Sequence, residues 1–521
     1  MHLLGNTEVS KVFVTVGAEQ EYFLIDKETF QKREDLIFTG RTLFGAKPPK
    51  GQELGDHYFG AIKPRVKSFM ESLNRELWKL GILAKTEHNE VAPAQHELAP
   101  VFTLVNTATD HNQLTMELMK KVAERHGLTC LLAEKPFKGV NGSGKHNNWS
   151  LVTDTGVNLL DPGETPNENL QFLLFLSAIL KAVDDYQDLL RASVASAGND
   201  HRLGAHEAPP AIVSVFLGDD LLNALKAFTN NSTYKAGKTT MRLGAKILPP
   251  LPKDTTDRNR TSPLAFTGNK FEFRMVGSND SIADCNVVLN TIVAESLDAF
   301  AKRLENSKNV TETVHDIVKE TLDAHERIIF NGNNYSQEWV EEAEKRGLKN
   351  LKTTPDAVVC YTLDKNVELF EKHKVLSKTE LFAIERVMLE NYSRIVKIEA
   401  LTMLDMAKKE IYPAINNYVS KVLETIELKK SNGLSVKCDL ELVKTLNSLN
   451  ETVYFETQNL EKLLEKVNQN TEDFLNVANV IKDEVLPCME RLRNSADEAE
   501  TLTDEKYWPY PSYAKLLFSV K

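Results

Sequence analysis

Val14-Thr-Val-Gly-Ala-Glu-Gln-Glu-Tyr-Phe-Leu-Ile25 predicts a strand, because the run is rich in β-branched and aromatic residues. The two-residue period of a strand then places Glu19 and Glu21 on the same face as Phe23 and Ile25. Carboxylates among apolar neighbours are costly unless they are neutralised or bind a cation, and two that point the same way favour a cation. The alternative interpretation is an edge strand whose glutamates face water.

Length and charge limit the classes of protein to which the chain can belong. Its 521 residues suffice for a large core and, by length alone, for about two to four domains. The net charge of −11 and the isoelectric point near 5.7 disfavour nucleic acid or an anionic membrane as the main partner. A local basic pocket for phosphate remains compatible with this charge.

The cysteines and the apolar runs indicate a cytoplasmic protein. The five cysteines are odd in number and widely spaced, which is untypical of disulfide frameworks and zinc sites and favours a reducing cytoplasm. The most apolar run, 170–183, is too short to span a bilayer and contains Lys181, so we expect a buried core helix. The start of the chain lacks the basic and apolar segments of a signal peptide.

The sequence pattern changes along the chain. Up to about Ser296, short β-type runs alternate with helical stretches, which predicts an α+β domain. From about Leu297 the pattern is mostly helical, and from roughly Met406 to Arg493 it is heptad-like and charged, as in a helical bundle. The aromatic segment 507–513 predicts either docking against another surface or a disordered end.

Further carboxylates occur in settings that suit a metal site. Pro93 bends the segment 88–97, so Glu90 and Glu97 are expected on the two arms of a turn. The glycines of 138–146 allow close backbone approach to a ligand and precede His146, although an ordinary surface hairpin turn would also explain them. In 270–274, strand alternation places Glu272 on one face with Lys270 and Arg274. This face would either line a charged cavity or point into solvent.

Two polar loops add cations and a further acid. Segment 198–210 is predicted as a loop and carries Arg202 and Glu207, and segment 254–263 carries Arg258 and Arg260. Loops of this composition usually only connect elements. Taken with the glutamates and His146 above, however, these arginines have a second interpretation. Oxygen ligands suit magnesium or manganese, and arginines neutralise phosphoryl oxygens. The combination suggests hard-cation sites that handle a phosphate-bearing substrate.

Six motifs, in the expected order along the chain, resemble those of glutamine synthetase. Their sequences closely resemble the type III branch of that family. They are Val16-Gly-Ala-Glu-Gln-Glu-Tyr-Phe-Leu, Asn89-Glu-Val-Ala-Pro-Ala-Gln-His-Glu, Asn141-Gly-Ser-Gly-Lys-His, Arg202-Leu-Gly-Ala-His-Glu-Ala-Pro-Pro, Asp257-Arg-Asn-Arg-Thr-Ser-Pro and Phe271-Glu-Phe-Arg. The resemblance implies a catalytic domain over 1–405 with the α+β fold shared by glutamine synthetases and guanidino kinases. An antiparallel sheet would line its active site, and a helical extension would follow over 406–521.

The resemblance also implies a reaction and a set of site residues. ATP would phosphorylate the γ-carboxylate of glutamate, and ammonia would then displace phosphate from γ-glutamyl phosphate at a site with two Mg²⁺ or Mn²⁺ ions. By motif position, one ion would be held by Glu21, Glu90 and Glu97, and the other by Glu19, His146 and Glu272. Substrate contacts would come from Asn141, Gly142, His88 and Arg202, and catalytic groups from Glu207, Arg260 and Arg274.

Some features depart from the family pattern. Ala265 stands where many members carry a second arginine, and Asn148 stands where a second histidine often occurs. The chain also begins almost at the catalytic strand, where the family has an N-terminal β-grasp domain that completes the neighbouring subunit's active site. We therefore expect either a ligase that assembles into a homo-oligomer of stacked rings or a truncated, silent subunit with a binding, assembly or regulatory role. A guanidino kinase is a third alternative.

Overall fold

The computed structural model describes residues 1–204, 208–230, 232, 240–241, 251–252, 260–469 and 473–520. Within them a nine-stranded sheet has the order β2-β3-β1-β6-β11-β10-β7, and β4 and β5 also pair with β1. Its strands are β1 Val12–Asp26, β2 Ala84–Asn89, β3 Gln95–Pro100, β4 Thr103–Leu104, β5 Leu128–Leu131, β6 Gly144–Thr153, β7 Val215–Phe216, β10 Leu264–Phe266 and β11 Phe271–Gly277. A separate ribbon pairs β8 Thr240–Met241 with β9 Leu251–Pro252. The predicted α+β fold is confirmed.

Strand β1 is the centre of the sheet. It pairs antiparallel with β6 along one side and with β3, β4 and β5 along the other. The edge-strand interpretation is therefore wrong. The predicted antiparallel sheet holds for every pair except β7 and β10, which run parallel. Antiparallel register places Glu19 opposite His146 and Glu21 opposite Glu97, so the pairing itself gathers the acidic residues.

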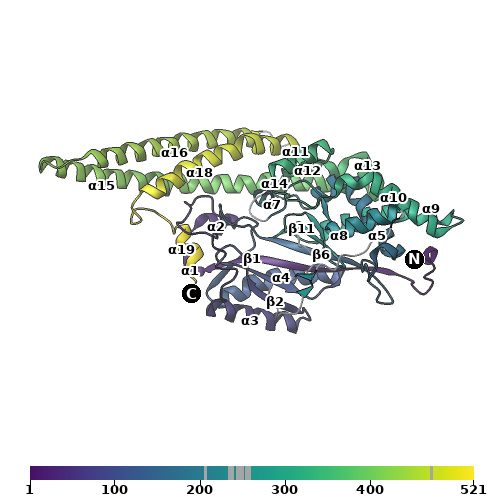
Figure 1. Ribbon diagram of the computed structural model, residues 1–521. Coiled ribbons are helices and arrows are strands. Elements are labelled where there is room, and N and C mark those ends of the chain that lie inside the picture. Colours follow the sequence, from purple (N-terminus) through teal and green to yellow (C-terminus); the bar gives the residue numbers. More distant parts are fainter. Residues whose placement is uncertain are drawn as a thin grey trace.

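The apolar residues of β1 hold the sheet against three sets of neighbours. Val16 and Ala18 belong to the main core with the helices that follow β6. Tyr22 and Leu24 pack among residues of α3 Pro64–Lys79 and α4 Val105–Arg125, which lie below the sheet in Figure 1. Phe23 joins a small cluster that includes residues near the C-terminus. Residues of this one strand thus belong to all three of these apolar clusters.

The remaining helices of the first half surround this sheet. They are α1 Lys27–Phe30, α2 Glu34–Thr39, α5 Leu170–Asp185, α6 Gln187–Ala192, α7 Ala197–Arg202 and α8 Asp219–Thr229. Helix α5 is buried along most of its length, as predicted for the most apolar run. Among the described residues, none of the helices combines the length and the hydropathy needed to cross a membrane.

Helix α7 corrects one prediction. The segment 198–210 is predicted as a loop, but its first residues are helical because the Ser196 hydroxyl accepts a hydrogen bond from the backbone N–H of Asn199 at 3.2 Å. This N-cap satisfies a backbone donor that would otherwise lack a partner. Arg202 consequently ends a helix and is buried, with 2% of its surface exposed. A short capped helix of polar residues leaves no hydrophobic period to detect.

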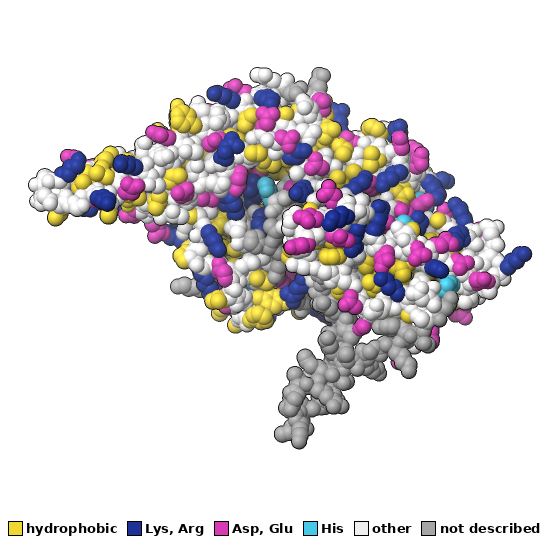
Figure 2. All heavy atoms as spheres, turned by 45° about the horizontal axis from the view of Figure 1, so that its top comes forward, with side chains coloured by type: hydrophobic (Ala, Val, Ile, Leu, Met, Phe, Trp, Pro, Cys, Tyr) yellow, Lys and Arg dark blue, Asp and Glu magenta, His cyan; other side chains and the backbone are white. Residues whose placement is uncertain are grey.

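The second half of the chain is helical, as predicted. Its helices are α9 Ala283–Glu305, α10 Val310–His325, α11 Gln337–Lys345, α12 Thr354–Val358, α13 Asp364–Lys372, α14 Lys378–Met406, α15 Tyr412–Ser431, α16 Lys437–Gln469, α17 Phe474–Val480, α18 Leu486–Leu502 and α19 Tyr513–Phe518. Helices α15 and α16 extend as an arm beyond the body (Figure 1), and acidic and basic side chains alternate over the face shown in Figure 2.

Two prolines interrupt this helical layer in the same way. π-helical turns at Ala407–Ile411 and Ile481–Val485 precede Pro413 and Pro487. Proline lacks an N–H and clashes with the preceding turn, and a wider turn relieves both problems. Helix α14 thus continues into α15 without a loop, and the domain boundary between residues 405 and 406 stays a prediction.

The aromatic segment near the C-terminus docks on the body of the protein. Trp508, Tyr510 and Tyr513 are buried, with exposed fractions of 9%, 6% and 1%. Arg33 stacks over the ring of Tyr510, with its guanidinium carbon 4.2 Å from the ring centroid. The docking interpretation is confirmed, and the disordered-end alternative is wrong.

Glu500 of helix α18 leads us to expect that the stability of the protein depends on pH. Burial raises the pKa of Glu500 to about 7, although its carboxylate accepts a hydrogen bond from the backbone of Ala46. Because the folded-state pKa lies above that of the unfolded chain, this group's stabilising contribution is complete below about pH 4.5 and is lost as pH rises to about 7. We expect Glu500→Gln to match the unsubstituted chain near pH 4.5 and to exceed it by about 1–2 kcal/mol at pH 8, after allowance for solvent screening.

Urea denaturation at both pH values measures this difference. Exposed Glu498, two residues away, provides the control as Glu498→Gln, for which the difference between the two pH values should stay within about 0.5 kcal/mol. A Glu500→Gln variant with the same advantage at both pH values would contradict the assignment.

Candidate active site

A cavity of about 280 Å³ opens where β1, β3, β6 and β11 lie side by side. Every predicted site residue except Glu207 lines it, namely Glu19, Glu21, His88, Glu90, Glu97, Asn141, Gly142, His146, Arg202, Arg260, Glu272 and Arg274. Glu207 lies outside the described residues, as does Arg258. Residues from six distant motifs therefore converge on one cavity.

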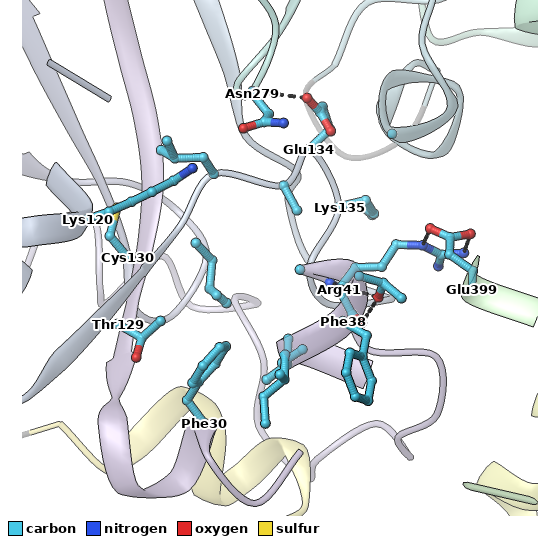
Figure 3. Close-up of a pocket in the computed structure, with 18 of the residues that line it drawn as sticks. Phe30, Phe38, Arg41, Lys120, Thr129, Cys130, Glu134, Lys135, Asn279 and Glu399 are labelled. Carbon is cyan, nitrogen blue, oxygen red and sulfur yellow. Dashed lines mark hydrogen bonds and ion pairs between the residues drawn. The ribbon is translucent and has the colours of Figure 1, made fainter. Parts of the chain in front are cut away.

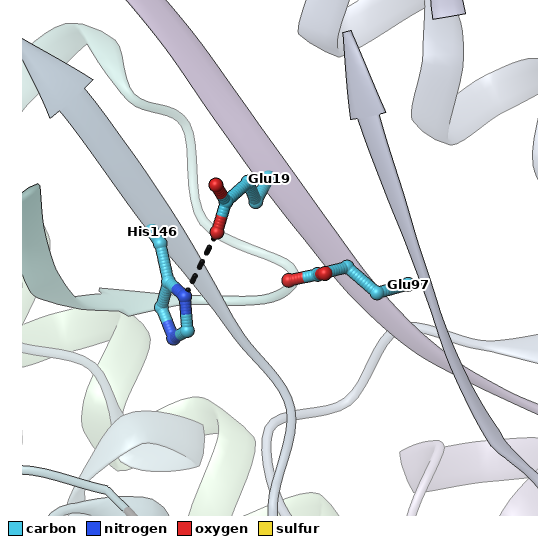
Figure 4. A group of neighbouring side chains, drawn as sticks. All are labelled: Glu19, Glu97 and His146. Carbon is cyan, nitrogen blue, oxygen red and sulfur yellow. Dashed lines mark hydrogen bonds and ion pairs between the residues drawn. The ribbon is translucent and has the colours of Figure 1, made fainter. Parts of the chain in front are cut away.

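His146 is the centre of one group of ligand-type side chains. Its Nδ1 lies 3.0 Å from Glu19 Oε2 and 3.2 Å from Glu272 Oε1. Glu97 completes a cluster with Glu19 and His146 in which candidate ligand atoms all lie within 4.8 Å of one another (Figure 4). Sheet register explains the cluster, because β6 lies between β1 and β11 and carries His146 directly opposite Glu19.

A second group surrounds His88 on β2. His88 Nε2 lies 2.8 Å from Glu90 Oε1 and 3.2 Å from Glu97 Oε2. The turn predicted at Pro93 brings the two glutamates together, and Ala94 adopts a positive φ of 64° within it. Glu97 belongs to both groups, so the two clusters share a carboxylate. Two adjoining clusters with a shared acid are compatible with two ions.

Backbone geometry places the remaining acid and the glycine loop. Glu21 accepts a hydrogen bond from the backbone N–H of Gly144 at 2.6 Å, which holds its carboxylate at the start of β6. A Cβ on Gly142 would lie 2.4 Å from the carbonyl oxygen of Glu134, so only glycine fits there. The surface-hairpin alternative for 138–146 is wrong, since Asn141 is 4% exposed and the segment leads into a central strand.

The charges in the cavity strongly affect one another. Burial alone would raise the pKa of Glu19, but hydrogen bonds from His146 and Asn148 lower it to about 2. Burial and the negative charge of Glu19 raise the pKa of Glu97 to about 8. Burial and the nearby Arg274 oppose the charging of His146, yet Glu19 and its other acidic neighbours raise the His146 pKa to about 9. The carboxylates and the imidazole therefore set one another's pKa values.

The donor set fits a divalent hard cation. Carboxylate oxygens with one imidazole are ligands that Mg²⁺ and Mn²⁺ accept, and the absence of thiolates from the described lining disfavours a soft metal. The division of the ligands between two ions remains a prediction.

Three arginines border the acidic groups. Arg202 is fixed by the backbone carbonyls of Val276 and Arg274, at 3.3 and 3.0 Å. The buried Nε of Arg202 lacks a hydrogen-bond acceptor within the described part of the chain, and the buried Nε of Arg274 lies 3.6 Å from Glu272 Oε1, beyond hydrogen-bond distance. Arg260 is exposed and lies over the ring of Tyr58, 5.9 Å from its centroid. The solvent-facing alternative for Glu272 and Arg274 is wrong, because both side chains are about one-tenth exposed.

Some residues of the site escaped the sequence analysis. Tyr58 lines the cavity and packs edge-on against His88. Gln52 exchanges two hydrogen bonds with Asn141, each of 2.8 Å. Both belong to the irregular segment between α2 and α3, which shows no strand or helix period. The aromatic run 57–59 is the signal that could have directed attention there.

An adjoining cavity of about 470 Å³ shares Glu19 with the first. Phe102, Lys85, Lys270 and Ser150 are among its lining residues. Asn148, one of the departures from the family pattern, lies here and donates a hydrogen bond to Glu19 Oε1 at 3.0 Å. An aromatic ring and two lysines beside an acidic centre suit a flat, phosphate-bearing molecule.

A larger cavity of about 810 Å³ lies between α2, β5 and α14 (Figure 3). Some of its charged groups pair with one another or with the backbone, since Arg41 pairs with Glu399 and Glu134 accepts a hydrogen bond from the backbone of Asn279. None of the predicted site residues that the structure describes lines it. The chemistry predicted from the sequence therefore belongs to the smaller cavity.

Comparisons with known proteins identify the family to which the motifs belong. A family model described as glutamine synthetase, catalytic domain, matches residues 3–214, and one described as glutamine synthetase C-terminal domain matches residues 313–430. A glutamine synthetase of Butyrivibrio fibrisolvens is 51% identical, over 100% of this chain and 75% of its own length. A type-3 glutamine synthetase of Dictyostelium discoideum is 45% identical, over 99% and 71%. A Bacteroides fragilis glutamine synthetase is 43% identical, over 99% and 73%.

Proposed function

This chain belongs to the glutamine synthetase family of glutamate–ammonia ligases, and we propose that it joins ammonia to L-glutamate with ATP through γ-glutamyl phosphate. The observation that carries the proposal is the convergence of five glutamates, two histidines and three arginines on one cavity. Such a cavity can hold metal ions, a phosphoryl group and an amino acid together.

In the first step an oxygen of the substrate γ-carboxylate attacks the terminal phosphorus of ATP, and the bond to the bridging oxygen of ADP breaks. Arg274 and Arg260 neutralise negative charge on the transferred phosphoryl group. The buried Nε of Arg274 is a donor that such a group can use. Arg202, His88, Asn141 and Gly142 hold the glutamate so that its side chain reaches the phosphate.

In the second step ammonium transfers a proton to Glu207, and the freed ammonia attacks the acyl carbon. The carbon–oxygen bond to phosphate then breaks, and the nitrogen releases another proton as the amide forms. This role of Glu207 rests on its motif position alone, since the residue lies outside the described part of the chain.

The metal ligands divide between two ions in the proposal. Glu21, Glu90 and Glu97 would hold one, and Glu19, His146 and Glu272 the other. Bound Mg²⁺ or Mn²⁺ supplies charge neutralisation and orientation of the phosphoryl oxygens. Residues of this chain contribute the geometry, because Glu19, His146 and Glu272 lie on three neighbouring strands. The adjoining cavity beside Phe102 would receive the nucleoside part of ATP.

The organisation of the chain follows the same proposal. Residues 1–405 form the catalytic domain and 406–521 a helical extension, and subunits assemble into a homo-oligomer of stacked rings. The compartment is the cytoplasm, which is supported by the free thiols of the five cysteines, all in the described part of the chain. Neither nucleic acid nor a membrane is a partner.

A direct assay tests the proposal. Chain incubated with glutamate, ammonium, ATP and Mg²⁺ or Mn²⁺ should form glutamine and phosphate in equal amounts, and omission of any reactant should stop both. Creatine and arginine, offered in place of glutamate, should remain unphosphorylated. A chain that ATP stabilises against thermal unfolding, but that forms no glutamine and has no γ-glutamyl transferase activity, would instead be a silent subunit.

A further inference from the structure

The C-terminal tail reaches the loop that carries two of the proposed glutamate contacts. This loop, residues 135–142, leaves β5 and leads to β6, with Asn141 and Gly142 at its inner end lining the active-site cavity. At its outer end, Lys138 contacts Tyr513, the first residue of α19. The two residues are separated by 375 positions in sequence.

The hydroxyl of Tyr513 joins three parts of the chain. It accepts hydrogen bonds from the backbone N–H of Lys138 at 3.1 Å and from Arg493 Nη2 at 2.8 Å. It also lies 2.5 Å from the hydroxyl of Thr42. Because the Thr42 hydroxyl donates to the carbonyl of Pro136 at 2.7 Å, Tyr513 donates to Thr42. Every hydrogen-bonding capacity of the tyrosine hydroxyl is thereby used, at a position 1% exposed.

The ring of Tyr513 fixes the loop by packing as well. It lies edge-on to Phe137, with centroids 5.4 Å apart, and Phe137 lies edge-on to Phe23 of β1 at 5.3 Å. A Cβ on Gly45 would lie 2.2 Å from the Tyr513 ring, so glycine permits the close approach. The aromatic series therefore connects the tail, the loop and the strand that bears Glu19 and Glu21.

The partners of Tyr513 are themselves held in place. Arg493 donates from Nη1 to the carbonyl of Thr42 at 3.0 Å and from Nε to Asp497 at 3.0 Å. Asp497 in turn accepts the backbone N–H of Gly45 at 2.6 Å. The network thus forms a rigid support outside the cavity, and none of its members lines the cavity.

We propose that Tyr513 is a positioning residue that holds loop 135–142 in the conformation needed to bind glutamate. The inference rests on the proposed function and adds to it a dependence of substrate affinity on the C-terminal tail. ATP binding should depend on it much less, since neither Asn141 nor Gly142 lines the adjoining cavity beside Phe102.

Tyr513→Phe tests this inference with Tyr510→Phe as its control. Both tyrosines are buried in the same tail, but the hydroxyl of Tyr510 has no hydrogen-bond partner within the described residues. Loss of a fully used buried hydroxyl should raise KM for glutamate roughly ten-fold in Tyr513→Phe, with KM for ATP changed less than about two-fold. Hydrogen exchange of the peptide covering 136–142 should accelerate by a similar factor. Tyr510→Phe should alter neither quantity.

Thr42→Val provides a second variant should Tyr513→Phe fail to fold. It removes the hydrogen bond to Pro136 and the acceptor for Tyr513, and we expect the same selective rise in KM for glutamate. Equal effects on glutamate and ATP, or exchange of 136–142 matching that of Tyr510→Phe, would overturn the inference. Hydrogen exchange is measured without catalysis. A chain without ligase activity would therefore refute the proposed function, and exchange would still test the coupling between tail and loop.

Discussion

Glu272→Ala is expected to abolish the manganese-dependent stabilisation of the chain by ATP and to lower glutamine formation by about 10³-fold. Glu272 lies on β11, with Oε1 3.2 Å from His146 Nδ1, and its side chain is 12% exposed. The substitution removes a carboxylate ligand from the group around His146. Since metal ions contribute several kcal/mol of charge stabilisation in phosphoryl transfer, loss of one ligand should affect rate and nucleotide binding together.

Thermal unfolding with and without Mn²⁺ and ATP measures the binding part of this prediction. Saturation at about 100 times Kd stabilises a folded protein by about 2.7 kcal/mol, which gives a clear shift in the unsubstituted chain. Glu320→Ala is a suitable control, because Glu320 is exposed and pairs with Arg303 at the surface. An unchanged ATP-dependent shift in Glu272→Ala would refute the assignment of Glu272 as a ligand.

Asp35→Ala is expected to destabilise the protein by about 3–5 kcal/mol. Asp35 and Arg33 form an ion pair with both side chains fully buried, through hydrogen bonds of 2.9 and 2.5 Å. Asp35 also accepts the backbone N–H of Leu43 at 2.8 Å. Burial opposes the charge of Arg33, but Asp35 raises the Arg33 pKa above its ordinary value, so alanine would leave a buried guanidinium without its counter-ion.

The consequence of this substitution can be separated from a simple loss of packing. Arg33→Met combined with Asp35→Leu removes both charges and should recover part of the lost stability, as measured by denaturant unfolding, because the backbone groups that bond to the pair still lose their partners. Arg303→Ala, which breaks a surface ion pair, should cost about 1 kcal/mol or less. Asp35→Ala within about 1 kcal/mol of the unsubstituted chain would contradict the prediction.

Local pattern predicted the elements whose residues carry a strong period. Strand β1 was expected over Val14–Ile25 and spans Val12–Asp26, and the apolar run 170–183 was expected as a buried helix and lies within α5 Leu170–Asp185. Helix α7 was missed because its stability comes from a cap and from tertiary burial, not from an amphipathic period. The parallel pairing of β7 with β10 was also missed, since strands of two and three residues carry too little pattern.

For the site, the order and type of residues were sufficient to select twelve residues that line one cavity. Alternation along β1 indicated a shared face for Glu19 and Glu21, and a proline turn indicated the proximity of Glu90 and Glu97. These are local consequences of backbone geometry, so they follow from a few consecutive residues. The family motifs then related the segments to one another without any knowledge of their distances.

The contacts between distant segments were decided by folding alone. Asn141 meets Gln52 across 89 residues, and Tyr513 meets Lys138 across 375, with no local signal for either pair. Such contacts depend on how helices and strands pack into the available volume, and many sequences with the same local periods could pack differently. The residue types therefore specified the chemistry, and long-range packing specified which groups share a cavity, their pKa values and the support behind them.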